Sequence, residues 1–152
     1  MTEITRIVAD ADVLAADLLV GGSARDALTL VRSHSWIELI ASDPLLVDAK
    51  AIIAALTTDE LADDWRETIE RERVAVEHPP DDHPALASAY RGEAAHILSF
   101  DERLQSAKAG VALKQHVDTS VKHPDAFVRL FDPEQLHEIV FDEPYPGPDR
   151  VP

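Results

Sequence analysis

The sequence predicts an α/β fold in which a mainly parallel sheet of about four to five strands lies between two layers of helices. Short apolar runs alternate along the chain with amphipathic segments of helical period. Runs of this kind suit parallel strands, which helices cover on both faces. The 152 residues, 45% of them hydrophobic, are enough for one domain with a buried core.

The first half of the chain is expected to form two strands and four helices. A continuous apolar strand comes first, and the helix after it ends at Gly21-Gly22, where Ser23 is expected to cap the next helix. Asp43-Pro44 is a favourable helix start because proline fits the first helical position. In order, the expected elements are strand Ile4–Ala9, helices Val13–Val20 and Ala24–Arg32, strand Trp36–Ile40, helix Leu45–Leu56 and a helix that starts at the capping box Thr57–Glu60.

The second half is expected to add two strands and four helices. His78–Pro84 is a loop, and small residues after it suit a helix that packs closely on a neighbour. Residues 1–141 are expected to form one domain, with the Pro/Gly-rich residues 142–152 as a disordered or draped tail. The expected elements are helix Ala85–Ala94, strand His96–Ser99, helix Glu102–Ala109 closed by Gly110, a strand within Val117–Val121, helix Pro124–Phe131 and a short helix capped by Asp132–Gln135.

Composition limits the classes of function. The chain has no cysteine, so disulfides and thiolate metal sites are excluded, and it has no apolar run long enough to span a membrane. We therefore expect a cytoplasmic protein. The net charge of −15, with no Asn, predicts a surface suited to molar salt, as in a halophilic archaeon. This charge argues against broad binding of nucleic-acid phosphates at ordinary salt, although in molar salt screening within about 3 Å weakens that argument.

Four carboxylates are placed to meet at one edge of the predicted sheet. Asp10 and Asp101 follow strands, and Asp48 and Asp82 lie near helix starts. In a parallel sheet, strand ends and the following helix starts share one edge. Each acid also has an ordinary explanation, as a helix cap or a solvent-facing charge. If the four do converge, hard divalent cations such as Mg²⁺ would neutralise them, and two such ions can activate a water and stabilise a leaving oxygen.

The order of these acids resembles the PIN domain family of metal-dependent ribonucleases, which includes toxins of toxin–antitoxin pairs. The family has an acid after the first strand, a second acid early in a later helix, a third seven residues before an Ala, a hydroxyl-x-Asp at a strand end and a late Pro-x-x-Phe. The matching pieces are Asp10–Leu14, Ser42–Asp48, Asp82 with Ala89, Ser99–Asp101 and Pro124–Phe127.

The resemblance implies a three-layer PIN-like fold and a Mg²⁺- or Mn²⁺-dependent nuclease that hydrolyses RNA. By this resemblance Asp10, Asp48, Asp82 and Asp101 hold the metals and are the catalytic residues. Ser99 is expected to hold a site carboxylate or a water by its hydroxyl, and Asp12 to cap a helix or support the site from behind. PIN relatives often dimerise, so a homodimer and an antitoxin-like protein partner are also expected.

Three departures from the family pattern leave other functions open. Ala11 and Asp12 replace the usual hydroxyl and amide, and Asp48 replaces the usual Glu. A PIN-like module that binds RNA or protein without cleaving is therefore one alternative. Another is a haloacid-dehalogenase-like phosphatase, because the stretch Asp10–Leu14 also resembles the nucleophile motif of that family. The chain is short for that family, and no later Ser/Thr and Lys pair followed by paired acids is present.

Other polar and aromatic side chains have simpler interpretations. His78, His83 and His96 lack the i, i+4 spacing of a zinc-binding helix and are expected on loops or at the surface. Trp65 and its helical stripe are expected in the core or in a dimer interface. Three cations near the proposed edge are expected either to contact a phosphate backbone or to face solvent: Arg91, Arg103 and Lys108.

Overall fold

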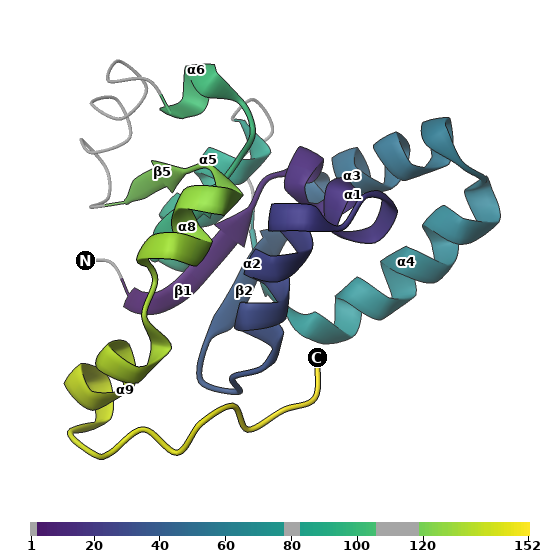
Figure 1. The fold of residues 1–152 in the computed structure, drawn as a ribbon. Helices are drawn as coiled ribbons and strands as arrows, with labels where there is room; N and C mark the ends of the chain where they lie inside the picture. The colour runs from purple at the N-terminus through teal and green to yellow at the C-terminus, as the bar shows by residue number, and fades with distance from the viewer. Residues whose placement is uncertain (1–2, 78–82, 106–118) are drawn as a thin grey trace.

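The computed structural model describes residues 3–77, 83–105 and 119–152, and a sheet of five parallel strands forms its centre (Figure 1). The strand order is β3-β2-β1-β4-β5, and every neighbouring pair is parallel. This confirms the predicted α/β class and the parallel sheet. The strands are β1 (Glu3–Ala9), β2 (Glu38–Ser42), β3 (Arg73–Val76), β4 (Ala94–Leu98) and β5 (Ser120–Lys122).

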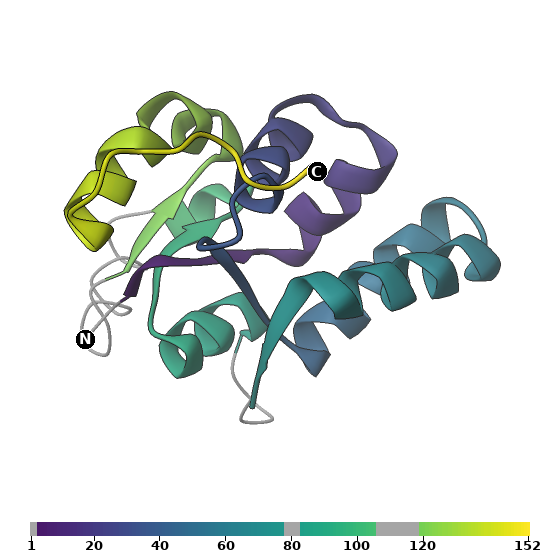
Figure 2. The same ribbon diagram turned by 90° about the horizontal axis from the view of Figure 1, so that it is seen from below.

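Helices cover both faces of the sheet, which gives the three layers expected from the sequence (Figure 2). On one face α5 contacts β1, β2 and β4, and on the other face α2 packs against α8. Helices α3 and α4 pair as a hairpin, and α3 also packs on α1. The described helices are α1 (Ala11–Leu19), α2 (Gly22–Arg32), α3 (Asp43–Leu56), α4 (Asp59–Glu72), α5 (Pro84–Gly92), α6 (Glu102–Gln105), α8 (Pro124–Leu130) and α9 (Pro133–Phe141).

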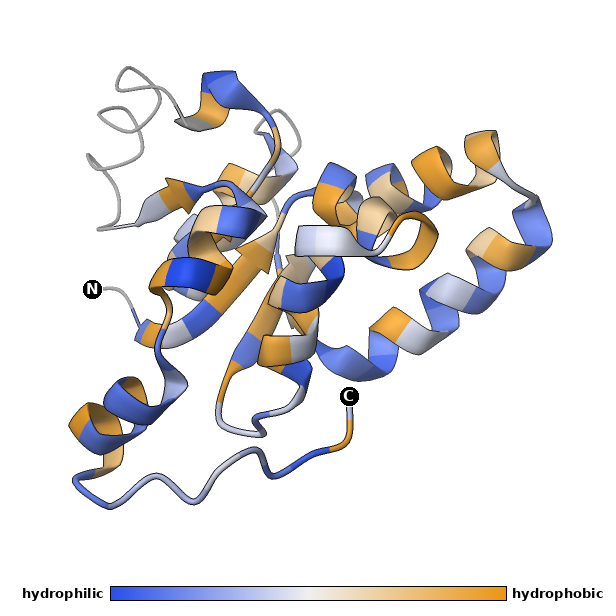
Figure 3. Ribbon diagram, in the orientation of Figure 1, coloured by the Kyte–Doolittle hydropathy of each residue, from blue (hydrophilic) through white to orange (hydrophobic). Residues whose placement is uncertain are grey.

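The core lies around β1, the middle strand of the sheet. Ile7, Val8 and Ala9 are fully buried because strands flank them and helices lie above and below. Phe127 of α8 is also fully buried. In the stripe predicted around Trp65, Trp65 and Ile69 lie in the core, whereas Leu61 is 37% exposed. Figure 3 shows the hydrophobic residues along the strands and a largely hydrophilic α4. Burying one large apolar side chain contributes about 1.5–3 kcal/mol, so this packing holds the layers together.

Strand β3 is the main difference from the elements expected from the sequence. The sequence predicts that the helix starting at Thr57–Glu60 leads directly into a loop. In the structure a four-residue edge strand lies between this helix and the loop. The Arg73 guanidinium donates to the carbonyl oxygen of Ala41 over 3.0 Å, which fastens β3 to β2. A strand this short, with a charged first residue and exposed central residues, carries no clear alternation of apolar and polar positions.

Helix starts were predicted with mixed success. The cap at Asp132 is confirmed, because its side chain accepts from two backbone amides of α9. The capping box Thr57–Glu60 marks the start of α4, but the cap is Thr58, one residue after the position that the box gives to Thr57. The cap at Ser23 was wrong, since α2 begins at Gly22 and Gly21 occupies the cap position with φ of +87°. Parts of the expected loop before α5 and of the helix after Asp101 lie outside the described residues, as does the start of the strand expected within Val117–Val121, which overlaps β5.

The C-terminal residues drape over the loop between α2 and β2, which is one of the two arrangements expected for the tail. The backbone amides of Asp149 and Arg150 donate to the carbonyl oxygen of Ser33. The Asp149 carboxylate accepts from the amide and hydroxyl of Ser35, and the Tyr145 hydroxyl lies 2.5 Å from His34 Nε2. None of the described helices is long and apolar enough to cross a membrane.

Helix α5 presses on the sheet at Gly92. A Cβ atom at this position would lie 2.4 Å from Cγ2 of Ile40, which is buried in β2 and stiff because it is β-branched. Gly92→Ala is therefore expected to lower the free energy of unfolding in urea by about 1–3 kcal/mol. Arg91→Ala, at an exposed neighbour, should change it by less than about 0.5 kcal/mol. Equal stability of Gly92→Ala and the native chain would contradict this close packing.

Candidate functional site

The strand order places the ends of β1 and β4 at a topological switch point. From β1 the chain proceeds to β2 and β3 on one side, whereas β4 and β5 lie on the other side of β1. Ligands of open α/β sheets bind outside the strand ends at such a reversal. Ala9 and Leu98, the last residues of the two strands, are paired in register. The residues that follow them are therefore neighbours, and Asp10, Asp12, Ser99 and Asp101 are called the strand-end site below.

Asp10 is fixed in place by the ends of both strands. Its backbone N–H donates to the carbonyl oxygen of Leu98 over 2.8 Å. Its Oδ1 accepts from the Ala11 amide over 2.8 Å, so Asp10 caps α1, which is the ordinary role that its sequence position allows. Its Oδ2 accepts from the Ser99 hydroxyl over 2.9 Å. The residue is 8% exposed, so the carboxylate is held in one orientation close to the surface.

Ser99 links the two acids that follow the strands. Its hydroxyl donates to Asp10 and accepts from the backbone amide of Asp101 over 3.0 Å. The Ser99 amide donates to the carbonyl oxygen of Lys122, so the link extends to β5. The contact with a carboxylate that the sequence predicted for this hydroxyl is present. Its role beside a metal remains a prediction.

Asp12 is tied to the loop after β4. Its Oδ1 accepts from the Val13 amide over 2.7 Å, and its Oδ2 accepts from the Phe100 amide over 3.1 Å. Burial raises the pKa of Asp12, and the nearby charges of Asp10 and Asp101 raise it further, against the lowering effect of the two amides. Asp12 therefore shares the electrostatic environment of the two strand-end acids, and its like-charge repulsion would be relieved by a cation.

Asp101 is more exposed than Asp10 and is surrounded by donors and cations. Its pKa is lowered mainly by the Arg103 amide, which donates to Oδ1 over 2.9 Å, and further by the Arg103 guanidinium. The charge of His83 also lowers this pKa, so the start of α5 comes near Asp101. Asp101 is therefore ionised over most of the pH range, as a ligand for a hard cation must be.

The other two predicted metal ligands are placed less clearly. Asp48 is exposed on the second turn of α3, whose start follows the end of β2. Asp82 lies outside the described residues. Among the residues that are described, no three His, Asp or Glu side chains are grouped closely enough to form a metal site. The structure thus brings Asp10 and Asp101 together with Asp12 and does not bring Asp48 into that group.

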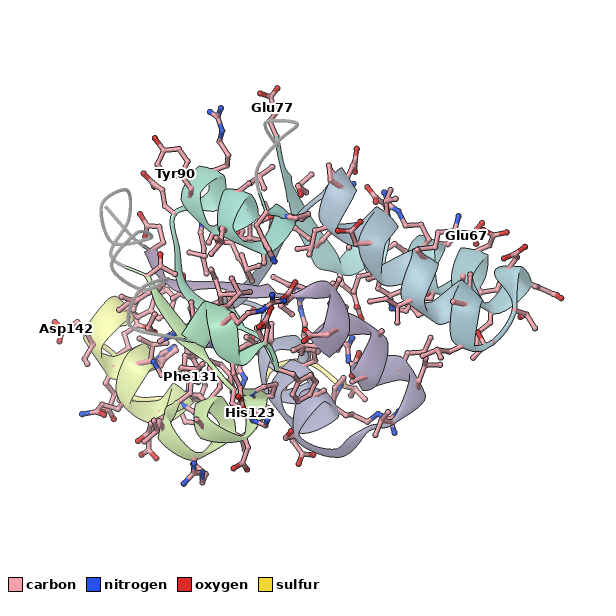
Figure 4. The ribbon with its side chains drawn as sticks, turned by 90° about the horizontal axis from the view of Figure 1, so that it is seen from above. Glu67, Glu77, Tyr90, His123, Phe131 and Asp142 are labelled. Carbon is pink, nitrogen blue, oxygen red and sulfur yellow. The ribbon has the colours of Figure 1, made fainter. Side chains whose placement is uncertain are left out.

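Sequence analysis missed two residues of this edge. His83 is exposed and lies outside the helices and strands, as the sequence predicted, but it also caps α5 by accepting from the Ala85 amide, and its charge acts on Asp101. Phe100 supplies its backbone amide to the site. The centroid of its ring lies 5.1 Å from that of His123, a residue that Figure 4 labels. Pro84 directly after His83 was the available signal, because a residue before a helix-starting proline is a candidate cap.

The residues of the strand-end site fit a hard divalent cation in kind. All three acids offer carboxylate oxygens, which Mg²⁺ and Mn²⁺ prefer. Burial is the main cause of the raised pKa of Asp12, and the smaller contributions of Asp10 and Asp101 are negative charge that a cation would balance. Several oxygens are already engaged by amides or by Ser99. Carboxylate oxygens can accept more than one partner, so these bonds orient the group without preventing coordination.

Comparison with known proteins assigns the family but no activity. The model of a family of unknown function, DUF7384, matches residues 1–152, so the chain belongs to that family. No curated protein and no solved structure matches the chain.

Ser99→Ala tests the link between the strands. The substitution leaves a nearly buried carboxylate oxygen of Asp10 without its donor, which should lower the free energy of unfolding by about 1–3 kcal/mol in urea. Ser23→Ala, at a half-buried position of α2, should change it by less than about 0.5 kcal/mol. A Ser99→Ala chain as stable as the native one would mean that the hydroxyl does not hold Asp10.

The raised pKa of Asp12 predicts a pH dependence of stability. The folded state holds the Asp12 proton to a higher pH than the unfolded state, so Asp12 removes stability as the pH rises from about 3.8 through its folded pKa. Asp12→Asn cannot ionise, and its stability should fall less steeply over that range in urea unfolding at a series of pH values. Asp125→Asn, exposed on α8, should give a curve parallel to the native one. A parallel curve for Asp12→Asn would refute the assignment.

Proposed function

We propose that this member of the DUF7384 family is a Mg²⁺- or Mn²⁺-dependent nuclease that hydrolyses phosphodiester bonds of RNA. The observation that carries the proposal is the Ser99 hydroxyl, which links Asp10 to the backbone of Asp101 at the switch point of the sheet. Two acids from distant parts of the chain thus meet where α/β proteins bind ligands. RNA as the substrate rests on the resemblance of the acid pattern to PIN domains.

Each residue of the strand-end site has a distinct role in this proposal. Asp10 and Asp101 would hold the divalent ions, with Asp12 near enough to add negative charge. Bound ions would activate a water and neutralise the charge that develops on the phosphodiester. Ser99 keeps Asp10 in one orientation, and Asp12 fixes the loop that carries Asp101 through the Phe100 amide.

Asp48 and Asp82 remain part of the proposal as additional ligands. Asp48 would need its exposed side chain to turn from the α3 surface toward the edge at which α3 begins. Asp82 precedes His83 in the sequence, and the charge of His83 acts on Asp101. A homodimer and an antitoxin-like partner are proposed only by analogy with PIN domains.

Cleavage of single-stranded RNA with Mn²⁺ in molar salt tests the proposal. Asp10→Asn and Asp101→Asn should each lower the rate by about 100-fold or more, since the substituted amide is a neutral and weaker ligand. The loss of negative charge should also weaken Mn²⁺ binding in calorimetry. Both measurements use purified protein, and the cleavage assay is repeated with a chelator added.

Asp125→Asn is the matched control for these variants. Asp125 is an exposed acid on α8, paired with Arg129, and its substitution should leave both cleavage and Mn²⁺ binding unchanged. Equal cleavage by the native chain, Asp10→Asn and Asp101→Asn would show that the activity does not come from the strand-end site. Cleavage that persists in chelator would show that it does not depend on a metal.

A second candidate function is a PIN-like module that binds RNA or protein without cleaving. Two observations favour it. Both Asp12 oxygens accept from backbone amides, and among the described residues no three His, Asp or Glu side chains are grouped as metal ligands. Such a module would show no saturable binding of Mn²⁺ in calorimetry and no cleavage. RNA retention in a filter-binding assay would then separate an RNA-binding module from a protein-binding one.

A further inference from the structure

A cavity of about 260 Å³ lies between the sheet and the last two helices. It opens to solvent beside Leu130 and Ile139, which are 70% and 67% exposed. This size is below the range of about 300–1,000 Å³ typical of drug-sized ligands, so only a compact ligand would fit. Its apolar walls include Ile4 of β1, Phe127 of α8, Phe131 directly after α8, and Ile139 of α9.

Lys122, at the end of β5, brings a positive charge to this cavity. Its ammonium donates to the Ser120 hydroxyl over 2.7 Å, and within the described part of the chain no acidic side chain forms an ion pair with it. Burial lowers the pKa of Lys122. The chain has 29 acids for 14 Lys and Arg, and Lys50, for comparison, is paired with Asp63 at 2.7 Å. An anion in the cavity would compensate the charge of Lys122.

His96 presents a second donor to the same cavity. The sequence placed it on a loop or the surface, but it lies half-buried on β4, and burial followed by the charge of Lys122 lowers its pKa to about 4. The Ser120 hydroxyl, which accepts from Lys122, lies 3.0 Å from His96 Nδ1. In the tautomer in which this hydroxyl donates to Nδ1, the neutral ring carries its proton on Nε2, for which the described residues provide no acceptor.

We propose that this cavity binds a small amphiphilic carboxylate, with its head group on Lys122 and His96 and its apolar chain along Phe131 and Ile139. A cation that has no ion pair among the described residues, beside an apolar surface, is complementary to a ligand with an anionic head and an apolar body. Phe127 and Phe131 stack at 4.6 Å, and each meets the His96 ring edge-on. The rings therefore form a continuous surface that leads from the apolar wall to the donors.

Asp132 also lines the cavity, and its charge is directed elsewhere. Its Oδ1 accepts from the amides of Glu134 and Gln135, where it caps α9. The positive end of the helix dipole compensates a carboxylate in this position. Its charge has no resolved effect on the pKa of Lys122 or of His96, so it does not already serve as their counter-ion.

Calorimetric titration with octanoate tests the proposal. The native chain should bind one octanoate, and 1-octanol should bind at least about tenfold more weakly because it lacks the charge. Acetate should also bind more weakly, and each methylene added to it should raise affinity by up to about fourfold until the cavity is filled. Binding should shift the ring resonances of His96 in NMR spectra.

Two variants and one control locate the ligand. Lys122→Met keeps the apolar stem and should lower octanoate affinity at least about tenfold, and Leu130→Asp should do the same by placing a negative charge at the mouth. Lys50→Met, at a surface lysine of α3, should bind as the native chain does. Because Leu130 is exposed, its substitution should leave the unfolding midpoint unchanged.

Three results would overturn the proposal. The first is equal octanoate affinity of the native chain and Lys122→Met, which would show that Lys122 does not bind the carboxylate. The second is equal affinity for octanoate and 1-octanol, which would leave only an apolar groove. The third is a native chain that binds no octanoate and sediments as a dimer, together with a Leu130→Asp chain that sediments as a monomer. A second copy of the chain would then cover the cavity.

Discussion

The hydrogen bond from the Ser99 hydroxyl to Asp10 is the contact on which the strand-end site depends. It joins the ends of β1 and β4, between which the strand order reverses, and the Ser99 hydroxyl oxygen also accepts from the Asp101 amide. Without it, Asp10 would be only the cap of α1, and Asp101 only an acid on a loop. One serine thus holds the Asp10 carboxylate and the Asp101 backbone in fixed positions beside each other. Asp12, through the Phe100 amide, holds the same loop from its other side.

The fold could be predicted from the sequence because local patterns and the global arrangement agree. The apolar run Ile7–Ala9 at the end of β1 indicates a strand covered on both faces, and the capping residues before α4 and α9 mark helix starts by their own hydrogen bonds. β3 could not be predicted, since its stability comes from pairing with β2 and from the bond of Arg73 to Ala41, which are distant in the chain. The position of Gly21 before α2 depends on a backbone angle that sequence pattern does not encode uniquely.

The candidate site was predictable only where it follows strand ends. Asp10 and Ser99 come directly after strands that the pattern identified, so their proximity follows from parallel pairing. Asp48 is on a helix, where a rotation of about 100° per residue decides whether a side chain faces the site or the solvent. Phe100 contributes through a backbone amide, which leaves no recognisable pattern in the sequence, and Pro84 indicates that His83 is a cap but not that its charge reaches Asp101.

The tail over the α2–β2 loop has a consequence for how this protein can be handled. Tyr145 lies against the rings of His34 and His137, and Trp36 packs edge-on against both histidines. A shortened chain that ended after α9 would uncover this aromatic group and leave the Ser33 carbonyl oxygen without its two amide donors. Shortened forms of this protein should therefore keep these residues, because they act as an integral clasp on the α2–β2 loop.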